Sequence, residues 1–332
     1  MAPRPASAIW VVLALGIVYI VWGSTYLAIA YVVETLPPFL AAGARFLVAG
    51  GMLGAFLIAR DRWRRSRGAA TALRAPRMVE WRTALIVGGL LILGGNGLVM
   101  VAEQTIPSGI AAVLVATAPL WMSLFDAAVT RRRPSMLAVG GLVVGLIGVG
   151  ILVMPSEGID ALDPLGVGLL IVANIGWAAG SVYARYAPQP RNELLGSSMQ
   201  QLAGGAALVV TALGVGELGG LDLAAVSIES WLGLIYLITF GSLLAFTAYI
   251  WLLNHVAVTT VATHAYVNPV VAVALGMLFR GEELTPRTLL AAALIIGAVV
   301  AMVSGRPRQT EEPGGSRNVA SIEPNDVEEG AT

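Results

Sequence analysis

The sequence predicts an all-α membrane protein with ten transmembrane helices in two inverted five-helix repeats. Three observations predict this fold: a very apolar composition, ten apolar segments of spanning length, and a weak internal repeat. The 332 residues are 57% hydrophobic and only 12% charged, with a mean hydropathy of +0.80. Because soluble domains carry about 25% charged residues, this chain cannot cover a water-facing surface of its size. The composition excludes a soluble enzyme, a nucleic-acid binder and a disordered protein.

Each predicted element is an apolar run long enough to cross a bilayer as a helix, which takes about 20 residues. The runs are rich in Leu, Ala and Gly and lack the alternation of barrel strands, so helices are expected. The first run follows Arg4 but is too long for a signal peptide, and we expect a retained helix. In chain order, the ten segments are 8–31, 37–59, 83–102, 107–129, 136–154, 164–184, 194–216, 230–253, 258–279 and 286–304.

Arginine lies mainly on one side of the predicted bundle. All twenty basic residues are arginines, and those outside the helices fall on one side of a ten-helix protein, Arg280 and Arg287 excepted. Because arginine collects on the cytoplasmic side, both termini of this multi-pass protein are expected there. Residues 305–332 are polar and charged and predict a disordered cytoplasmic tail.

The two halves of the chain, 8–154 and 164–304, are similar to each other. Trp22 and Tyr31 recur as Trp177 and Tyr186 at an offset of 155, and residues 106–119 align with 256–269 at an offset of 150. Each copy holds five helices, an odd number, so the second copy must be inverted relative to the first. Inverted repeats of this kind are typical of transporters.

Several short motifs stand out along the chain: Trp22–Tyr26, Pro37–Pro38, Arg45–Phe46, Asn96–Gly97, Ala102–Glu103, Pro107–Ala112, Trp177–Tyr183 and Tyr266–Pro269. These motifs resemble those of the EamA family, in the drug/metabolite transporter superfamily, and its inner-membrane transporters in particular. The resemblance implies ten helices, cytoplasmic termini and a substrate cavity between the halves. The chain departs from the family in lacking a Lys near residues 28–30 and the Gly-Glu pair near residues 131–132, which the second half keeps at 281–282.

Polar and aromatic residues at bilayer depth are the candidate substrate-binding residues. Arg45 is expected either to bind a substrate carboxylate, to pair with Glu103, or to snorkel to the headgroups. The asparagines offer donors and acceptors to a ligand or to a neighbouring helix, and the aromatic residues form a cavity wall or simply pack. The predicted set is Trp22, Tyr26, Arg45, Asn96, Asn174, Trp177, Tyr266 and Asn268.

A second set is expected in gating or coupling. Pro119 and Pro269 occupy equivalent places in the two halves and predict paired kinks, mobile or static. Proton coupling would require Glu103, His264 or Asp126, although a lone membrane His more often packs and Asp126 lies beside arginines suited to an ion pair.

The sequence therefore predicts a secondary transporter that exports small metabolites, such as amino acids or amphipathic drug-like molecules, by alternating access. The expected partners are a small-molecule substrate and membrane lipids, with no nucleic acid, in a monomer or a weak homodimer. With no Cys, two His and no nucleotide-binding run, no metal or cofactor is expected. The alternatives are uptake or exchange of a sugar or nucleotide conjugate, a membrane enzyme or lipid-handling protein, and a non-transporting scaffold.

Overall fold

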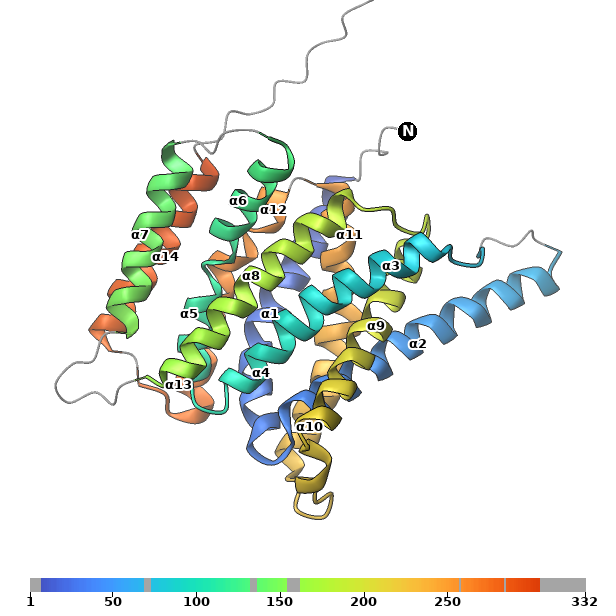
Figure 1. The fold of residues 1–332 in the computed structure, drawn as a ribbon, viewed down its shortest axis with the longest axis horizontal. Coiled ribbons are helices and arrows are strands. Elements are labelled where there is room, and N and C mark those ends of the chain that lie inside the picture. The colour runs from blue at the N-terminus through green and yellow to red at the C-terminus, as the bar shows by residue number, and fades with distance from the viewer. Residues whose placement is uncertain are drawn as a thin grey trace, which may run out of the picture.

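The computed structural model describes residues 7–68, 73–131, 136–153, 162–256, 258–283 and 285–304. Within these ranges the chain is helical and contains no strand (Figure 1). Each of the ten predicted segments coincides with helix. The predicted tail, 305–332, lies outside the described residues. The helices are α1 Ala8–Thr35, α2 Pro38–Ser66, α3 Met78–Val87, η1 Gly88–Gly97, α4 Leu98–Ala102, α5 Ser108–Val115, α6 Ala118–Val129, α7 Met136–Val153, α8 Pro164–Tyr186, α9 Glu193–Gly214, η2 Glu217–Gly220, α10 Ile228–Tyr236, η3 Leu237–Phe246, α11 Thr247–His255, α12 Val258–Val261, α13 His264–Arg280 and α14 Pro286–Ser304.

Six helical segments in the described residues are long and apolar enough to cross a membrane. They are Ala8–Thr35, Pro38–Ser66, Met78–Ala102, Ser108–Val129, Pro164–Tyr186 and Ile228–His255. α9 is more polar because it carries two serines and two glutamines in its first half, all of them buried within the protein. Ser198 donates to the carbonyl of Gly50 at 2.8 Å, so this polar face holds α9 against α2. The count of ten crossings stays a prediction.

Small residues set the spacing of α9 against its neighbours. A Cβ atom on Gly88 would lie 2.6 Å from the backbone nitrogen of Gly204, so η1 and α9 approach at a distance that only glycine permits. The Gly50-x-x-x-Gly54 motif, which could have served a dimer, also faces α9. Cβ atoms on its two glycines would lie 3.0 Å from Leu202 N and from Ser198 Oγ. This motif is therefore used inside the chain.

The irregular stretches of the helices recur in the two halves. Two ten-residue π-helices interrupt the third and eighth predicted segments, η1 from Gly88 and η3 from Leu237. The separation between the first residues of these two π-helices is close to the offset of 150 to 155 residues at which the sequence repeats. The fourth and ninth segments are likewise each divided in two, after Val115 and after Val261. Because π-helices are rare and gather at functional sites, the middle of the bundle is where function is expected.

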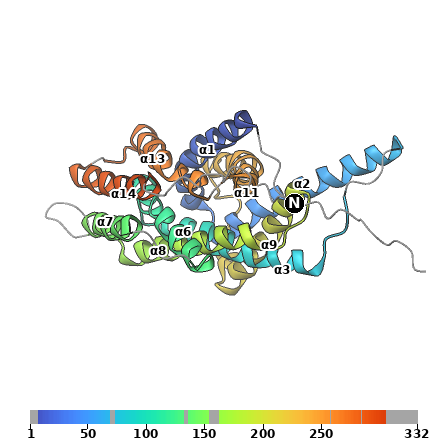
Figure 2. The same cartoon turned by 90° about the horizontal axis from the view of Figure 1, so that it is seen from above.

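The long helix α1 packs against α13, α10 and η3. α7 and α14 lie side by side at one edge, and the C-terminal part of α2 projects beyond the other helices at the opposite edge (Figures 1 and 2). One apolar core cluster surrounds Phe46, Phe246 and Tyr249, and a second lies between α5, α8 and α13. The candidate functional site lies between these two clusters.

Candidate functional site

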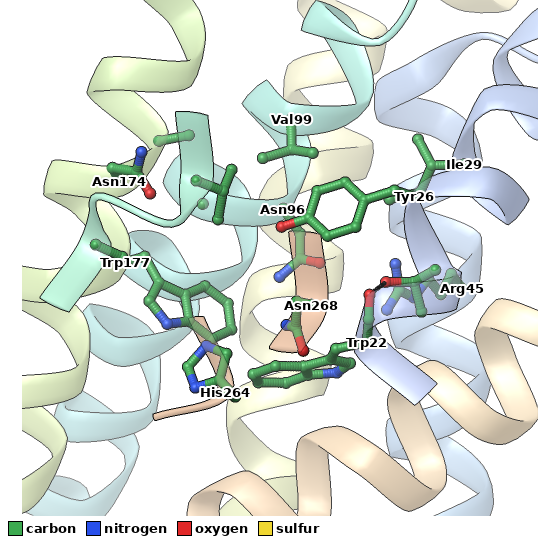
Figure 3. A pocket seen from close by; sticks show the side chains of 15 residues that line it. Trp22, Tyr26, Ile29, Arg45, Asn96, Val99, Asn174, Trp177, His264 and Asn268 are labelled. Carbon is green, nitrogen blue, oxygen red and sulfur yellow. Dashed lines mark hydrogen bonds between the residues drawn. The ribbon is translucent and has the colours of Figure 1, made fainter. Parts of the chain in front are cut away.

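A cavity lies in the middle of the bundle, where segments from both halves of the chain meet (Figure 3). Its empty volume is about 600 Å³, counting the open space at its mouth. The structure brings seven of the eight predicted binding residues to its wall. They are Trp22, Tyr26, Arg45, Asn96, Asn174, Trp177 and Asn268. The eighth, Tyr266, lies in α13, but its side chain is outside the described residues.

Aromatic rings form one wall of this cavity. The rings of Trp22 and Trp177 meet edge to face at 5.2 Å, and His264 stands edge-on to Trp22 at 5.4 Å. Tyr249, fully buried behind them, accepts a hydrogen bond from Trp177 Nε1 at 3.1 Å, and its hydroxyl lies 2.7 Å from Ser181 Oγ. The indole nitrogens thus have partners within the protein, and the ring surfaces remain for an apolar ligand group.

Sequence reasoning missed Tyr249. It lies near the end of the predicted segment 230–253, where a tyrosine usually marks the membrane interface. No feature of the local sequence separates such a residue from one that packs behind the cavity wall.

Arg45 is the buried cation of the site, with 2% of its surface exposed. Its Nε donates to Ser242 Oγ at 2.7 Å, and its guanidinium carbon lies 4.6 Å from the ring centre of Phe46. One terminal nitrogen, Nη1, is buried without a hydrogen-bond partner. No ion pair forms between Arg45 and any described carboxylate, so the pairing with Glu103 that the sequence allowed is absent in this conformation. The burial of Arg45 also keeps it from the headgroups.

The three asparagines hold the irregular helices in place. Asn174 Nδ2 donates to the Leu114 carbonyl at 3.0 Å, where α5 ends, and Asn96 Nδ2 donates to the Leu91 carbonyl within η1 at 3.2 Å. When the amide of Asn268 is oriented with its nitrogen toward these groups, that nitrogen donates to the carbonyls of His264 and Tyr19 at 3.1 and 3.0 Å. Carbonyls freed by a break in a helix need such partners in a membrane. Each asparagine keeps a side-chain oxygen that a ligand can use.

The predicted gating residues fall at different places. Pro119 lies in the first turn of α6, directly after the break, whereas Pro269 lies inside α13, beyond its break. His264 lines the cavity and donates from Nδ1 to the Val261 carbonyl at 2.8 Å. Asp126 accepts a hydrogen bond from the Tyr186 hydroxyl at 2.8 Å; in the described part of the chain it forms no ion pair. Arg132 and Arg133 lie outside the described residues.

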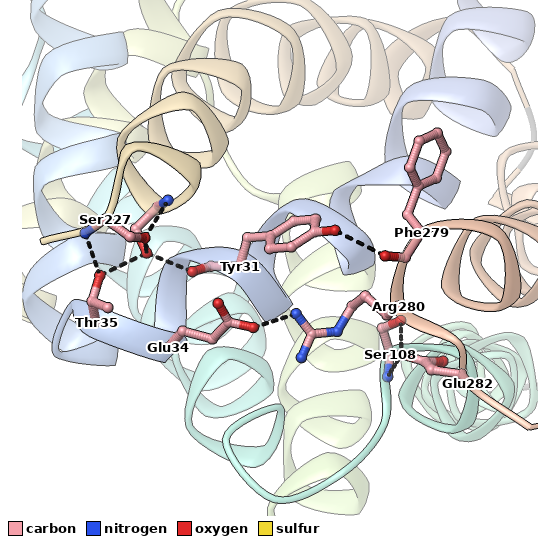
Figure 4. A network of polar contacts seen from close by, with 9 residues as sticks. Tyr31, Glu34, Thr35, Ser108, Ser227, Phe279, Arg280 and Glu282 are labelled. Carbon is pink, nitrogen blue, oxygen red and sulfur yellow. Dashed lines mark hydrogen bonds and ion pairs between the residues drawn. The ribbon is translucent and has the colours of Figure 1, made fainter.

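A polar network joins helices at the end of the bundle where α1 and α13 finish and α5 begins, here named the Glu34 end (Figure 4). Glu34 pairs with Arg280 at 2.5 Å, and the Tyr31 hydroxyl donates to the Phe279 carbonyl at 3.2 Å. Thr35 and Ser227 extend this network to the start of α10. These contacts hold α1, α10 and α13 together at one end of the cavity.

Glu282 contributes a second contact at the Glu34 end. Its carboxylate accepts hydrogen bonds from Ser108 N at 3.0 Å, Ser108 Oγ at 2.6 Å and Gly109 N at 2.9 Å. A carboxylate at the start of a helix also meets the positive end of the helix dipole. The sequence showed the Gly281-Glu282 pair as a family feature without its partner, because the partner lies in the other half of the chain.

Glu103 follows α4 directly and is also near the Glu34 end. Only 6% of its surface is exposed, and neither carboxylate oxygen has a hydrogen-bond partner. Burial raises the pKa of Glu103 well above its ordinary value, the neighbouring charge of Glu282 raises it further, and Arg280 opposes the shift. Glu103 does not line the cavity, although its charge acts on the phenol of Tyr26, which does.

The chain is similar to membrane transporters over most of its length. The model of the EamA-like transporter family matches residues 8–154 and 164–304, and the chain belongs to this family. The "Uncharacterized inner membrane transporter YedA" of Escherichia coli K12 is 38% identical over 295 residues, which cover 88% of this chain and 90% of that protein. The threonine/homoserine exporter RhtA of the same organism is 29% identical over 229 residues, 66% of this chain and 70% of that protein.

A solved crystal structure also has this fold. It superposes with a TM-score of 0.61 at 20% sequence identity and covers 88% of this chain and 95% of its own. The family, the apolar helices and the inner-membrane relatives together define a multi-pass membrane protein of transporter type.

Proposed function

We propose that this protein is a secondary transporter that exports small metabolites with a carboxylate and an apolar part, amino acids foremost, by alternating access. The observation that carries the proposal is Arg45, a buried guanidinium on the cavity wall with a terminal nitrogen that lacks an acceptor. A substrate carboxylate supplies the missing acceptor, and charge-assisted hydrogen bonds to arginine are among the strongest in proteins.

The remaining wall matches the rest of an amino acid. The rings of Trp22, Trp177 and His264 offer an apolar surface for its side chain. Its ammonium group finds side-chain oxygens on Asn96 and Asn268, and aromatic faces attract cations. An amino acid as substrate agrees with the exporter named among the relatives.

Alternating access follows from two repeats, 8–154 and 164–304, that together supply ten crossings. The paired π-helices and the paired helix breaks support this division. The arginine distribution supports cytoplasmic termini, which turns the Glu34 end to the outside. The network between α1, α10 and α13 is then the outer gate, and it must open to release substrate.

A sugar or nucleotide-conjugate transporter is the second candidate. Multiply charged phosphates require several cations in the site. In the described part of the cavity wall, Arg45 is the only arginine, and the chain has no lysine. The wall therefore favours a substrate with a single carboxylate.

Ligand-dependent thermal stability of the purified protein tests the proposal. One or a few amino acids should raise the melting temperature of the detergent-solubilised chain, because a ligand that binds only the folded state stabilises it. Arg45→Gln should abolish the shift, and Arg67→Gln, on the exposed end of α2, should keep it. Stabilisation by a nucleotide sugar alone would favour the second candidate, and the absence of any ligand effect would favour a scaffold.

A further inference from the structure

We propose that Glu103 is a proton-binding site and that the Glu34 end of the bundle closes only when this carboxyl group is protonated. The inference rests on the proposed transport function in one respect, that this end opens and closes. The observation behind it is that the Glu103 carboxyl group is buried at the edge of the membrane-spanning region, and both of its oxygens lack hydrogen-bond partners.

Four other carboxylates around this end have partners. Glu34 binds Arg280, Glu282 binds the start of α5, and Glu217 accepts from the backbone nitrogens of Phe39 and Leu40. Asp163 caps α8 and accepts a hydrogen bond from Thr105. Glu103 therefore differs from its neighbours in being both enclosed and unpaired.

The groups that face Glu103 do not neutralise it. α1 brings the phenol of Tyr26, and the end of α13 brings Arg280 and then Glu282, one charge of each sign. Both charged groups already have partners: Arg280 pairs with Glu34, and Glu282 accepts a hydrogen bond from the start of α5. α2 packs against α4, but Arg45, its ionisable group at this depth, is bonded to Ser242. α8 and η1 add no described charge to those that act on Glu103, and the carboxylate that caps α8, Asp163, bonds Thr105.

A charge enclosed without a partner is expensive, so a group in this position binds a proton instead. When the Glu34 end opens, water reaches the carboxyl group and it ionises near the ordinary range of a glutamate. The closed state thus binds one more proton than the open state. By linkage, acid favours closure and alkali favours opening.

A single-cysteine reporter measures this equilibrium without any transport assay. The chain has no native cysteine, so Ile29→Cys places one thiol on the cavity wall of α1. In sealed vesicles, a membrane-impermeant maleimide added on the side of the Glu34 end reaches this thiol only when that end is open. The labelling rate is measured from about pH 6 to about pH 9 in full-length protein, with and without Glu103→Gln. The ratio of the two rates removes the pH dependence of the thiol itself.

The ratio of the rate with Glu103 to the rate with Glu103→Gln should rise with pH, by up to about tenfold for each pH unit between the pKa of Glu103 in the open state and its raised pKa in the closed state, because opening releases one proton over that interval. Glu103→Gln should stay in the slow, closed form throughout, because glutamine mimics the neutral acid. Glu229→Gln, an exposed carboxylate near the same end, should keep the rise. A flat ratio would overturn the proposal.

Melting temperature supplies a second readout that does not need the reporter. The unmodified chain should melt higher in acid than in alkali, and Glu103→Gln should lose this difference while melting at least as high as the unmodified chain. A large loss of stability in Glu103→Gln would show that the carboxylate is charged and needed, which contradicts the proposal. Because neither readout requires substrate, failure of the amino-acid assignment leaves this test intact.

Discussion

The indole rings of Trp22 and Trp177 meet edge to face, with ring centroids 5.2 Å apart and an interplanar angle of 82°. One ring belongs to the first half of the chain and the other to the corresponding helix of the second half. Their contact places the equivalent positions of α1 and α8 against each other on the cavity wall. The cavity wall is therefore built jointly by the two halves.

Gly95 makes room for this contact. A Cβ atom at Gly95 would lie 2.8 Å from Cε3 of the Trp177 ring, so Gly95→Ala should push the indole away and destabilise the protein by about 1–3 kcal/mol. Gly89 lies in the same π-helix with no neighbour within 4 Å, and Gly89→Ala should cause no loss. Thermal denaturation of both variants checks the prediction, and equal melting temperatures would contradict it.

Arg45 should be replaceable for folding but not for binding. Arg45→Lys keeps the charge and loses the planar fork, so substrate affinity should fall about 10- to 100-fold, equivalent to roughly 1.5–3 kcal/mol. Ser242→Ala removes only the hydrogen bond that holds Nε and should weaken binding less. Calorimetric titration of each variant measures the effect. If Arg45→Lys fails to accumulate as folded protein, Arg45 is a structural link between α2 and η3 rather than a binding residue.

Arg131 and Gly281 follow corresponding helices, α6 and α13, and both have left-handed backbone, with φ of 53° and 64°. This conformation costs a non-glycine residue about 1–2 kcal/mol. Arg131→Gly should therefore stabilise the protein by up to about 1 kcal/mol, and Gly281→Ala should destabilise it by about as much. Gly168→Ala in α8, where the backbone is not left-handed, is the matched control. A stability loss in Arg131→Gly would argue against the paired conformation.

Glu282 and Glu34 should contribute different amounts to the stability of the Glu34 end. Glu282→Gln weakens three hydrogen bonds at the start of α5 and should cost about 1–2 kcal/mol, the range of a helix cap. The Glu34–Arg280 pair is more exposed, so Glu34→Gln should cost less than about 1 kcal/mol. Chemical denaturation ranks the two variants. The reverse order would show that the ion pair, not the cap, holds this end.

Much of the fold was predictable because spanning segments are long, apolar and sharply bounded. The cavity residues were predictable for a related reason: at bilayer depth, Arg45 and Asn174 are conspicuous against an apolar background. Hydropathy does not report hydrogen-bond pattern, so the π-helices were not visible, whereas Pro119 indicated a kink close to the break between α5 and α6. Nor could the sequence pair Glu282 with Ser108, since this contact joins residues far apart in the chain.

Motifs of small residues show a further limit of sequence reasoning. Gly50 and Gly54 have the spacing of a dimerisation motif, yet both face α9 of the same chain. The spacing specifies close approach of a second helix and not the chain that supplies it. Arg45 and Glu103 show the same limit for charges, because opposite signs at similar depth suggested a pair that this conformation does not form.

Counterflow in proteoliposomes tests the central claim most directly. Vesicles loaded with an unlabelled amino acid and containing the purified protein are diluted into the same amino acid in labelled form, across a panel. The account predicts saturable, transient accumulation of label for one or a few amino acids, lost in Arg45→Gln and retained in Arg67→Gln. Label at the level of protein-free vesicles for every amino acid, from protein shown to be folded, would contradict it.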